Sequence, residues 1–221
     1  MAALPPSTPS PLRQGLLAAW PVALGYFPVA VAFGMAGASA GLAPWAVALL
    51  SLFVFAGASQ FAFLGLLAEG ASPWLAVGVA LLLNLRHAFY GPALRPYLAG
   101  HPVLAFFLTD EVFAVALKSL PGLPEPARTG FFLGLGLGAY LAWNLGTLLG
   151  VFGAAGLKGL PGAEEGLSFA LPALFLLLAL PHLRNPVALG AGLLAFALHL
   201  LGQTAWGLVL AGVLGFLWRR P

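Results

Sequence analysis

Six polar residues form two short clusters inside stretches of the sequence that are otherwise apolar. The clusters are Asn84, Arg86 and His87, and Thr109, Asp110 and Glu111. An ionised side chain at the centre of a membrane helix costs about 2.5–3.5 kcal/mol on insertion scales, so it usually has a partner or lies on a solute pathway. The two clusters are therefore predicted to take part in moving a polar solute.

Arg86 and the two acids suggest complementary roles toward a zwitterion. Arg86 would bind a substrate carboxylate, while Asp110 or Glu111, with Thr109 beside them, would bind an amine or carry a coupled proton. Two alternatives stay open. In the first, Arg86 pairs with one of the acids only to lower the insertion cost. In the second, both acids lie in water near the outer interface.

Helix breaks are expected where proline and glycine lie in apolar segments. Pro28 removes one helical hydrogen bond, so a break near Gly25 is predicted, with free backbone groups beside Tyr26. A second break is predicted after the first cluster, at Gly91–Pro92 and Pro96. Such breaks would line a cavity for a zwitterion.

Further polar side chains complete the candidate site. Gln60, next to Ser59, is an amide in mid-span that needs a partner, and a later segment carries an amide and a hydroxyl one turn apart. The predicted substrate-binding residues are Gly25, Tyr26, Pro28, Ser59, Gln60, Asn84, Arg86, His87, Trp143, Asn144 and Thr147. The predicted coupling residues are Thr109, Asp110 and Glu111. The glycines at 134, 136 and 138 are attributed to close helix packing.

Composition identifies the solvent in which these residues must lie. Of the 221 residues, 61% are hydrophobic and 7% are charged, whereas a soluble domain carries about 25% charged residues. The 29 glycines and 19 prolines are also typical of membrane helices. The absence of cysteine excludes disulfides and thiolate chemistry, and a net charge of +3 is too small to indicate nucleic-acid binding.

The hydrophobic pattern predicts an all-α polytopic membrane protein with about eight spans. The predicted spans are 15–40, 44–68, 73–93, 101–120, 129–156, 167–180, 186–201 and 203–218. Seven spans is the alternative, because only Gly202 separates the last two. Matches at an offset of 84 residues suggest that spans 4–6 are an inverted repeat of spans 1–3.

The distribution of basic residues predicts the orientation. With the N-terminus inside, six basic residues fall on the cytoplasmic side and two on the outer side, as the positive-inside rule requires, while Arg86 lies within a span. We therefore expect a cytoplasmic tail at 1–14, a single transmembrane domain at 15–218 and a cytoplasmic tail at 219–221. The expected location is the inner (cytoplasmic) membrane.

Enzymatic classes find little support in the sequence. An intramembrane aspartyl protease needs two Asp residues in facing spans, and Asp110 is the one Asp in the chain. No Walker-type loop and no metal-ligand spacing occur, so neither a cofactor nor a metal is expected. A structural or regulatory membrane subunit without a pathway of its own remains the alternative to a transporter.

Five sequence strings resemble the AzlC family of branched-chain amino acid permeases. They are GYFPVAVAFG (25–34), FAGASQF (55–61), NLRHAFYG (84–91), LTDEVFA (108–114) and AWNLGTLLG (142–150). The resemblance covers roughly residues 15–179 and implies secondary export of Leu, Ile, Val and analogues, driven by an ion gradient. It also implies a small four-span partner of the AzlD type.

One position departs from the family pattern. The sixth span is expected to open with an acidic residue before Phe-Ala, but this chain has Ser168 before Phe169. The identity of the coupling ion therefore stays open. The preferred aliphatic substrate also stays open, because apolar pockets separate side chains that differ by one methylene by only about 1–3 kcal/mol.

Overall fold

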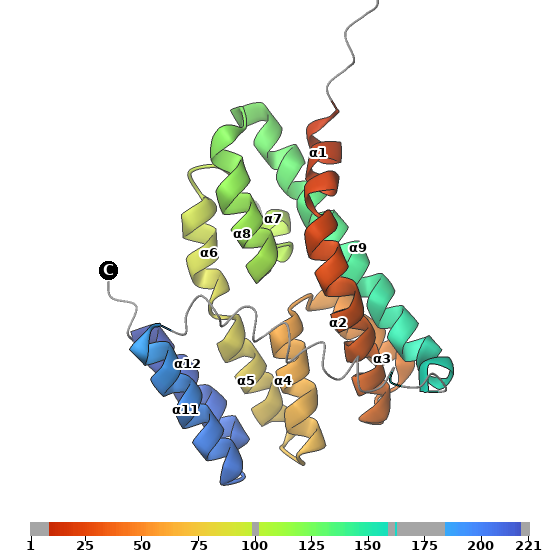
Figure 1. Ribbon diagram of the computed structural model, residues 1–221, viewed down its shortest axis with the longest axis vertical. Helices are drawn as coiled ribbons and strands as arrows, with labels where there is room; N and C mark the ends of the chain where they lie inside the picture. The colour runs from red at the N-terminus through yellow and green to blue at the C-terminus, as the bar shows by residue number, and fades with distance from the viewer. Residues whose placement is uncertain (1–8, 99–101, 159–161, 163–183, 218–221) are drawn as a thin grey trace, which may run out of the picture. The chain divides into compact units, whose positions relative to one another are not determined.

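The computed structural model describes residues 9–98, 102–158, 162 and 184–217, and the regular structure in these ranges is helical throughout (Figure 1). The helices are α1 (Pro11–Ala18), α2 (Trp20–Ser39), α3 (Pro44–Phe53), α4 (Gly57–Ala68), α5 (Pro73–Asn84), α6 (His87–Leu94), α7 (Pro102–Phe106), α8 (Asp110–Ser119), the 3₁₀ turn η1 (Leu120–Gly122), α9 (Glu125–Lys158), α11 (Pro186–Leu200) and α12 (Thr204–Leu217). The all-α prediction is confirmed for these residues. The predicted sixth span and Ser168 lie outside them.

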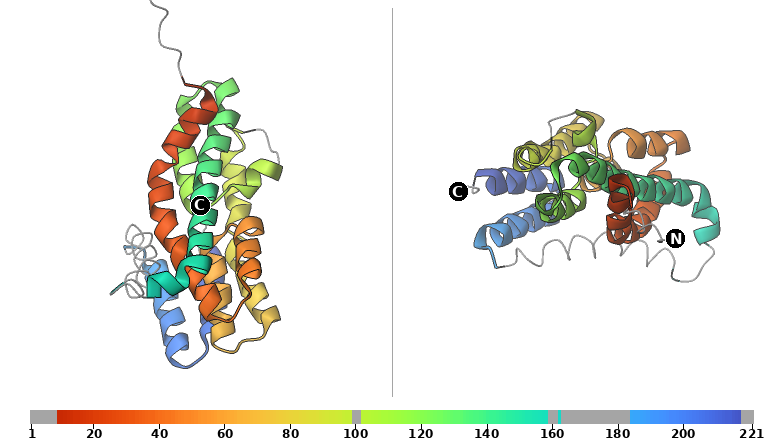
Figure 2. Two further views of the ribbon diagram at one scale, coloured as in Figure 1. Left: turned by 90° about the vertical axis from the view of Figure 1, so that its right-hand side faces the viewer. Right: turned by 90° about the horizontal axis from the view of Figure 1, so that it is seen from above.

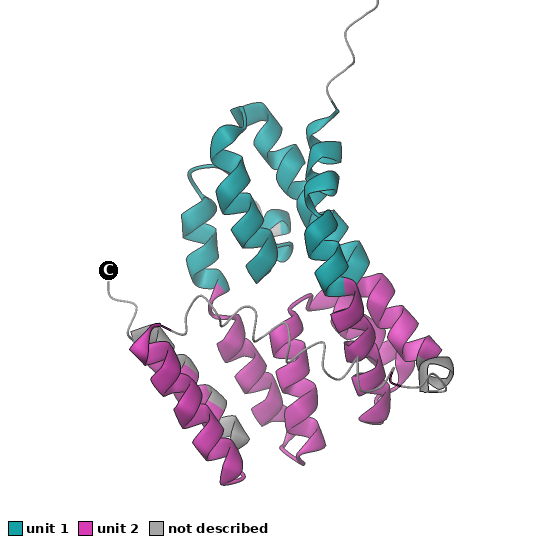
Figure 3. Cartoon of the chain, viewed as in Figure 1, with its two compact units in different colours: residues 1–26, 87–143 teal, residues 27–86, 144–221 magenta. Residues whose placement is uncertain are grey.

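The chain divides into two compact units (Figure 3). Unit 1 comprises Met1–Tyr26 and His87–Trp143, and unit 2 comprises Phe27–Arg86 and Asn144–Pro221. Helices α2 and α9 each contribute residues to both units, and the remaining boundary falls between α5 and α6. Each unit is described by itself below.

Two helices in the described ranges are long and apolar enough to cross a bilayer by themselves, namely α2 and residues Glu125–Gly153 of α9. The apolar helices α3, α4 and α11 are shorter, with 10, 12 and 15 residues. At about 1.5 Å per residue they rise about 15–23 Å, less than the roughly 30 Å of hydrocarbon in a membrane.

Unit 1 contains a contact between α1 and α9 that only glycine permits. A Cβ placed on Gly15 would lie 2.0 Å from the Phe131 carbonyl oxygen, and one on Gly134 would lie 2.0 Å from the Leu12 carbonyl oxygen. The two backbones therefore touch, as small residues allow in membrane helix pairs. One helical turn after Gly134, a Cβ on Gly138 would meet the Ala19 methyl group. The packing role predicted for these glycines of α9 is confirmed.

Unit 2 repeats this packing between α2 and the later part of α9. A Cβ on Gly34 would lie 2.3 Å from the Thr147 carbonyl oxygen, and one on Gly150 would lie 2.1 Å from the Val31 carbonyl oxygen. A hydrogen bond of 2.7 Å between the hydroxyls of Ser51 and Thr147 links α3 to α9 in the same unit. Ser51 and Thr147 are both buried.

Unit 2 also contains two helical hairpins. Leu66 of α4 packs with Ala76 and Val79 of α5, and Val209 of α12 lies against the same cluster. Helices α11 and α12 lie side by side in Figures 1 and 2. The turn between them places Gly202 at φ +71°, a conformation that suits glycine. Gly202 therefore separates two helices, as the predicted boundary required.

The predicted break near Gly25 is wrong. Helix α2 continues from Trp20 to Ser39 with Pro28 in its interior. Proline removes one backbone hydrogen bond, but membrane helices tolerate that loss when neighbouring helices support them. Here the turn after Pro28 is held by the contact of α2 with α9 in unit 2. The interruption in this segment lies earlier, at Ala19, between α1 and α2.

Three other predicted spans are interrupted near their middles. Residues 54–56 separate α3 from α4, residues 85–86 separate α5 from α6, and residues 107–109 separate α7 from α8. The predicted break at Gly91–Pro92 is wrong in position, because α6 contains Pro92 and ends at Leu94. The actual break lies one to two turns earlier, at Leu85–Arg86. The other two breaks were not predicted.

Candidate functional site

The carboxylates of the second polar cluster lie at the start of α8 in unit 1. Thr109 is the N-cap residue, and its Oγ1 accepts a hydrogen bond from the Val112 amide at 3.4 Å. Asp110 and Glu111 therefore occupy the first turn of the helix. The positive end of the helix dipole favours carboxylates at this position. The break before α8 thus places two acids in a partly buried setting.

Glu111 is joined to Tyr26 of α2. The Tyr26 hydroxyl is hydrogen bonded to Glu111 Oε2 and to Thr109 Oγ1, the latter at 2.7 Å. A phenol carries one proton, so the Thr109 hydroxyl can supply the second hydrogen. Tyr26 is 6% exposed and its ring meets the edge of Trp143 at 5.5 Å. Four of the predicted site residues are therefore in direct contact.

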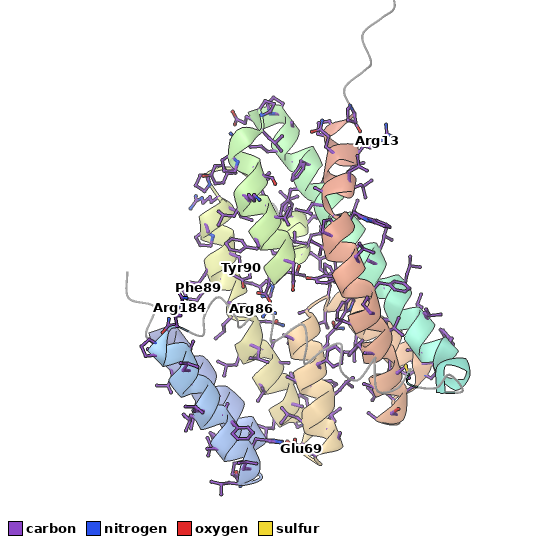
Figure 4. The ribbon with its side chains drawn as sticks, in the orientation of Figure 1. Arg13, Glu69, Arg86, Phe89, Tyr90 and Arg184 are labelled. Atoms are coloured by element: carbon purple, nitrogen blue, oxygen red, sulfur yellow. The ribbon has the colours of Figure 1, made fainter. Side chains whose placement is uncertain are left out.

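Asp110 is held by a tyrosine that the sequence reasoning missed. The hydroxyl of Tyr90 on α6 donates a hydrogen bond to Asp110 Oδ1. The Tyr90 ring stacks on Phe113, with centroids 4.3 Å apart and planes 10° apart. Figure 4 labels Tyr90 on this helix. Its position one turn after His87 was the signal available in the sequence, because both side chains then lie on one helix face.

His87 binds the backbone of the same break. Its Nε2 lies 2.7 Å from the carbonyl oxygen of Leu108, which precedes Thr109. A carbonyl can only accept, so Nε2 carries the hydrogen. His87 therefore donates a hydrogen bond to a backbone carbonyl in the break between α7 and α8. The histidine ring also meets the Tyr90 ring edge at 5.6 Å.

The first polar cluster is divided by the break between α5 and α6. Asn84 is the last residue of α5, and the Leu85 amide donates to the Leu82 carbonyl at 3.1 Å in a tightened final turn. Arg86 lies in the break itself, where Figure 4 labels it. The guanidinium group therefore projects from irregular backbone and not from a helix interior.

The break between α3 and α4 in unit 2 has an unusual backbone. Phe55 has φ +40°, the left-handed region that residues other than glycine rarely adopt, and it is 2% exposed. Ser59 donates its hydroxyl to the Ala56 carbonyl at 2.8 Å. Gln60 is 2% exposed, and neither its Nε2 nor its Oε1 has a hydrogen-bond partner among the described residues.

The predicted site residues fall in both units. Those of unit 1 are Gly25, Tyr26, His87, Thr109, Asp110, Glu111 and Trp143. Those of unit 2 are Pro28, Ser59, Gln60, Asn84, Arg86, Asn144 and Thr147. Among the latter, Ser59, Gln60, Asn144 and Thr147 are buried. Gly25 faces open space, so nothing in its surroundings requires glycine.

Together these features define a helical membrane protein with interrupted helices and buried polar groups, and comparison with known proteins agrees. The sequence profile of the AzlC protein family matches residues 21–157, and the chain belongs to this family. The match ends before residue 179, the end expected from the sequence strings. The profile of a second family, MJ1155, matches residues 164–218.

Relatives in three organisms are described as membrane or transport proteins. An uncharacterized membrane protein of Archaeoglobus fulgidus is 39% identical over 92% of this chain and 91% of its own length. The inner membrane protein YgaZ of Escherichia coli is 35% identical over 74% of this chain and 69% of its own. The branched-chain amino acid transport protein AzlC of Bacillus subtilis is 27% identical over 72% and 62%. No solved structure matches the chain.

Proposed function

We propose that this chain is the large subunit of a secondary transporter that exports branched-chain amino acids across the inner membrane. Leu, Ile, Val and analogues are its substrates, and it acts with a small four-span subunit of the AzlD type. Family membership and the relationship to the Bacillus transport protein support the substrate class. The chain has no catalytic role and needs no cofactor.

The observation that carries the proposal is the pair of tyrosine–carboxylate contacts at the start of α8. A tyrosine hydroxyl can donate to a carboxylate and can accept from a carboxylic acid. The pairs Tyr26–Glu111 and Tyr90–Asp110 can therefore keep a hydrogen bond in either protonation state of the acid. We assign proton binding to these acids, with Thr109 as the capping residue that orients them, and inward proton movement drives the export.

The remaining candidate residues are assigned to the substrate. Arg86 supplies a positive charge for the carboxylate, as the sequence suggested, and it lies in the break between α5 and α6. Transporters often bind substrates where helices are discontinuous, because the free backbone groups there can contact the ligand. The other assigned residues are Tyr26, Ser59, Gln60, Asn84, His87, Trp143, Asn144 and Thr147.

The membrane arrangement follows from the short helices. Because α3 and α4 are each too short to cross, we propose that they cross in series as one broken span, as do α5 with α6 and α7 with α8. This gives about eight spans within a membrane domain at 15–218. The tails at 1–14 and 219–221 are then cytoplasmic, and spans 1–3 and 4–6 form the inverted repeat.

Cells that lack their own exporters test the proposal when they are fed a leucine-containing dipeptide. Co-expression of the chain and its partner is expected to lower free cytoplasmic leucine several-fold, measured by mass spectrometry of washed cells. Cells that express the partner alone are the control. The Asp110→Asn and Arg86→Gln variants should retain leucine. A non-transporting subunit predicts that both variants behave as wild type, and unchanged retention with the wild-type chain would reject export.

A further inference from the structure

We infer that the first turn of α4, together with the Gln60 side-chain amide, binds the α-carboxylate of the transported amino acid. The substrate here is that of the proposed function, so the assignment holds only if the chain transports such an amino acid. All the residues involved lie in residues 55–61 of unit 2.

Helix α4 begins without a cap. Its N-cap residue is Ala56, which has no side chain that can accept a hydrogen bond. Helices α5, α8 and α11 start differently, because Ser72, Thr109 and Asn185 each accept from a backbone amide of the first turn. The first amides of any helix have no acceptor inside that helix. Where a helix start has no cap, these amides can therefore donate hydrogen bonds to another group.

The uncapped start is also buried. Ala56 is 4% exposed and Ser59 is 1% exposed, whereas Gly57 and Ala58 are half-buried. The backbone amides of Gly57, Ala58 and Ser59 have no acceptor in the part of the chain that the structure describes. Gly57 and Ala58 carry almost no side chain, so a ligand can approach these amides closely.

Gln60 supplies the second and independent observation. The residue is 2% exposed, and both polar atoms of its side-chain amide lack partners among the described residues. Side chains of a helix lean toward its N-terminus and residues four apart share a face, so Gln60 lies on the face of α4 that begins at Ala56. Burying an amide without a hydrogen-bond partner costs the free energy of removing it from water. A ligand that hydrogen bonds to the amide would offset this cost.

The combined chemistry suits a carboxylate with an ammonium group beside it. Backbone N–H groups at the positive end of the helix dipole, with Gln60 Nε2, can donate to two carboxylate oxygens. Gln60 Oε1 can accept from the neighbouring ammonium group. The Phe61 ring, which contacts the Phe33 ring edge at 5.5 Å, offers apolar surface beside this turn for an aliphatic side chain.

The backbone that leads into α4 fits a ligand site. Phe55 is a buried residue at φ +40°, and such strained conformations are found preferentially at binding sites. Phe55 immediately precedes Ala56, the N-cap residue of α4.

Competition in inside-out membrane vesicles tests the assignment. The vesicles come from cells that co-express the full chain and its partner, and they take up labelled leucine. Uptake is measured in competition with unlabelled leucine, leucinamide or leucinol. Leucinol lacks the carboxylate. In wild type we expect leucine to compete about 10- to 100-fold better than leucinol. Hydrogen bonds to a charged group contribute an affinity difference of about this size. In Gln60→Met this ratio should fall by about tenfold or more.

Two additional variants keep the test decisive. Gln60→Glu places an acid beside the carboxylate, so leucinamide should compete better than leucine. Gln203→Met, at an exposed glutamine in the turn before α12, should leave the ratio unchanged.

Gln60→Met should also raise the melting temperature of the purified chain, because it removes an unpaired buried amide. A structural hydrogen-bonding role for Gln60 predicts a lower melting temperature.

The outcomes separate the two proposals. Leucine uptake with an unchanged leucine-to-leucinol ratio in folded Gln60→Met and Gln60→Glu would overturn the carboxylate site and leave transport intact. No leucine uptake by wild-type vesicles would reject the proposed function, and the carboxylate site with it.

Discussion

Replacing Glu111 by glutamine is expected to reduce leucine transport driven by a pH gradient to background. Glutamine has nearly the same shape and can still bond to the Tyr26 hydroxyl, but it cannot take up a proton. The exchange of labelled for unlabelled leucine needs no net proton movement, so it should persist within about threefold. Both fluxes can be measured in inside-out vesicles with an acidic interior.

Glu69→Gln is the matched control for this experiment. Glu69 follows α4, its side chain is 46% exposed, and it lies 3.9 Å from His199. Exposed ion pairs contribute about 0–1 kcal/mol, so this variant should transport normally. Gradient-driven uptake by Glu111→Gln at the wild-type rate would contradict the coupling role of Glu111.

Adding a single methyl group at Gly150 is expected to destabilise the protein by about 3 kcal/mol or more. The new Cβ would lie 2.1 Å from the Val31 carbonyl oxygen, a backbone atom that cannot move without displacing α2. Overpacking of this kind usually costs about 1–3 kcal/mol, and contact with backbone raises the cost. Thermal unfolding of the purified Gly150→Ala variant, followed by size-exclusion chromatography, measures the effect.

Gly78→Ala provides the comparison, because Gly78 is also helical and a Cβ there meets no atom within 4 Å. Alanine is favoured over glycine inside helices by about 0.5–1 kcal/mol, so this variant should be as stable as wild type or more stable. Equal melting temperatures for the two variants would show that α2 and α9 do not touch at Gly150.

Composition and the hydrophobic pattern were sufficient to predict the helical class and the approximate positions of most described helices, but not where helices break. Pro28 and Pro92 were over-interpreted, because packing against neighbours holds a helix together after the loss of one hydrogen bond. The break at 54–56 contains no proline. It depends on the left-handed Phe55, a conformation that tertiary packing imposes and that local sequence preferences oppose.

The start of α8 could have been found from sequence. Threonine followed by two acids is a typical helix start, with an N-cap and negative charges in the first turn. The sequence reasoning instead placed Thr109, Asp110 and Glu111 inside a continuous span. Reading that signal would have predicted the break at 107–109.

The polar residues of the site were largely recognised because polar groups in apolar segments are rare. Tyr26, Thr109 and Glu111 were all selected, and they do lie in contact. Tyr90 was missed because tyrosine is common at membrane interfaces and does not stand out. Its role depends on a contact with Asp110, twenty residues away in the chain, and only the structure supplies it.

Proton movement that accompanies leucine movement is the most direct test of the transport mechanism. Leucine is added outside inside-out vesicles that contain the wild-type chain and its partner, in weakly buffered medium with a pH-sensitive dye. Entry of leucine should release protons from the vesicles, so the external pH falls in proportion to the leucine taken up. Leucine entry with no change in external pH would contradict proton coupling through the α8 carboxylates.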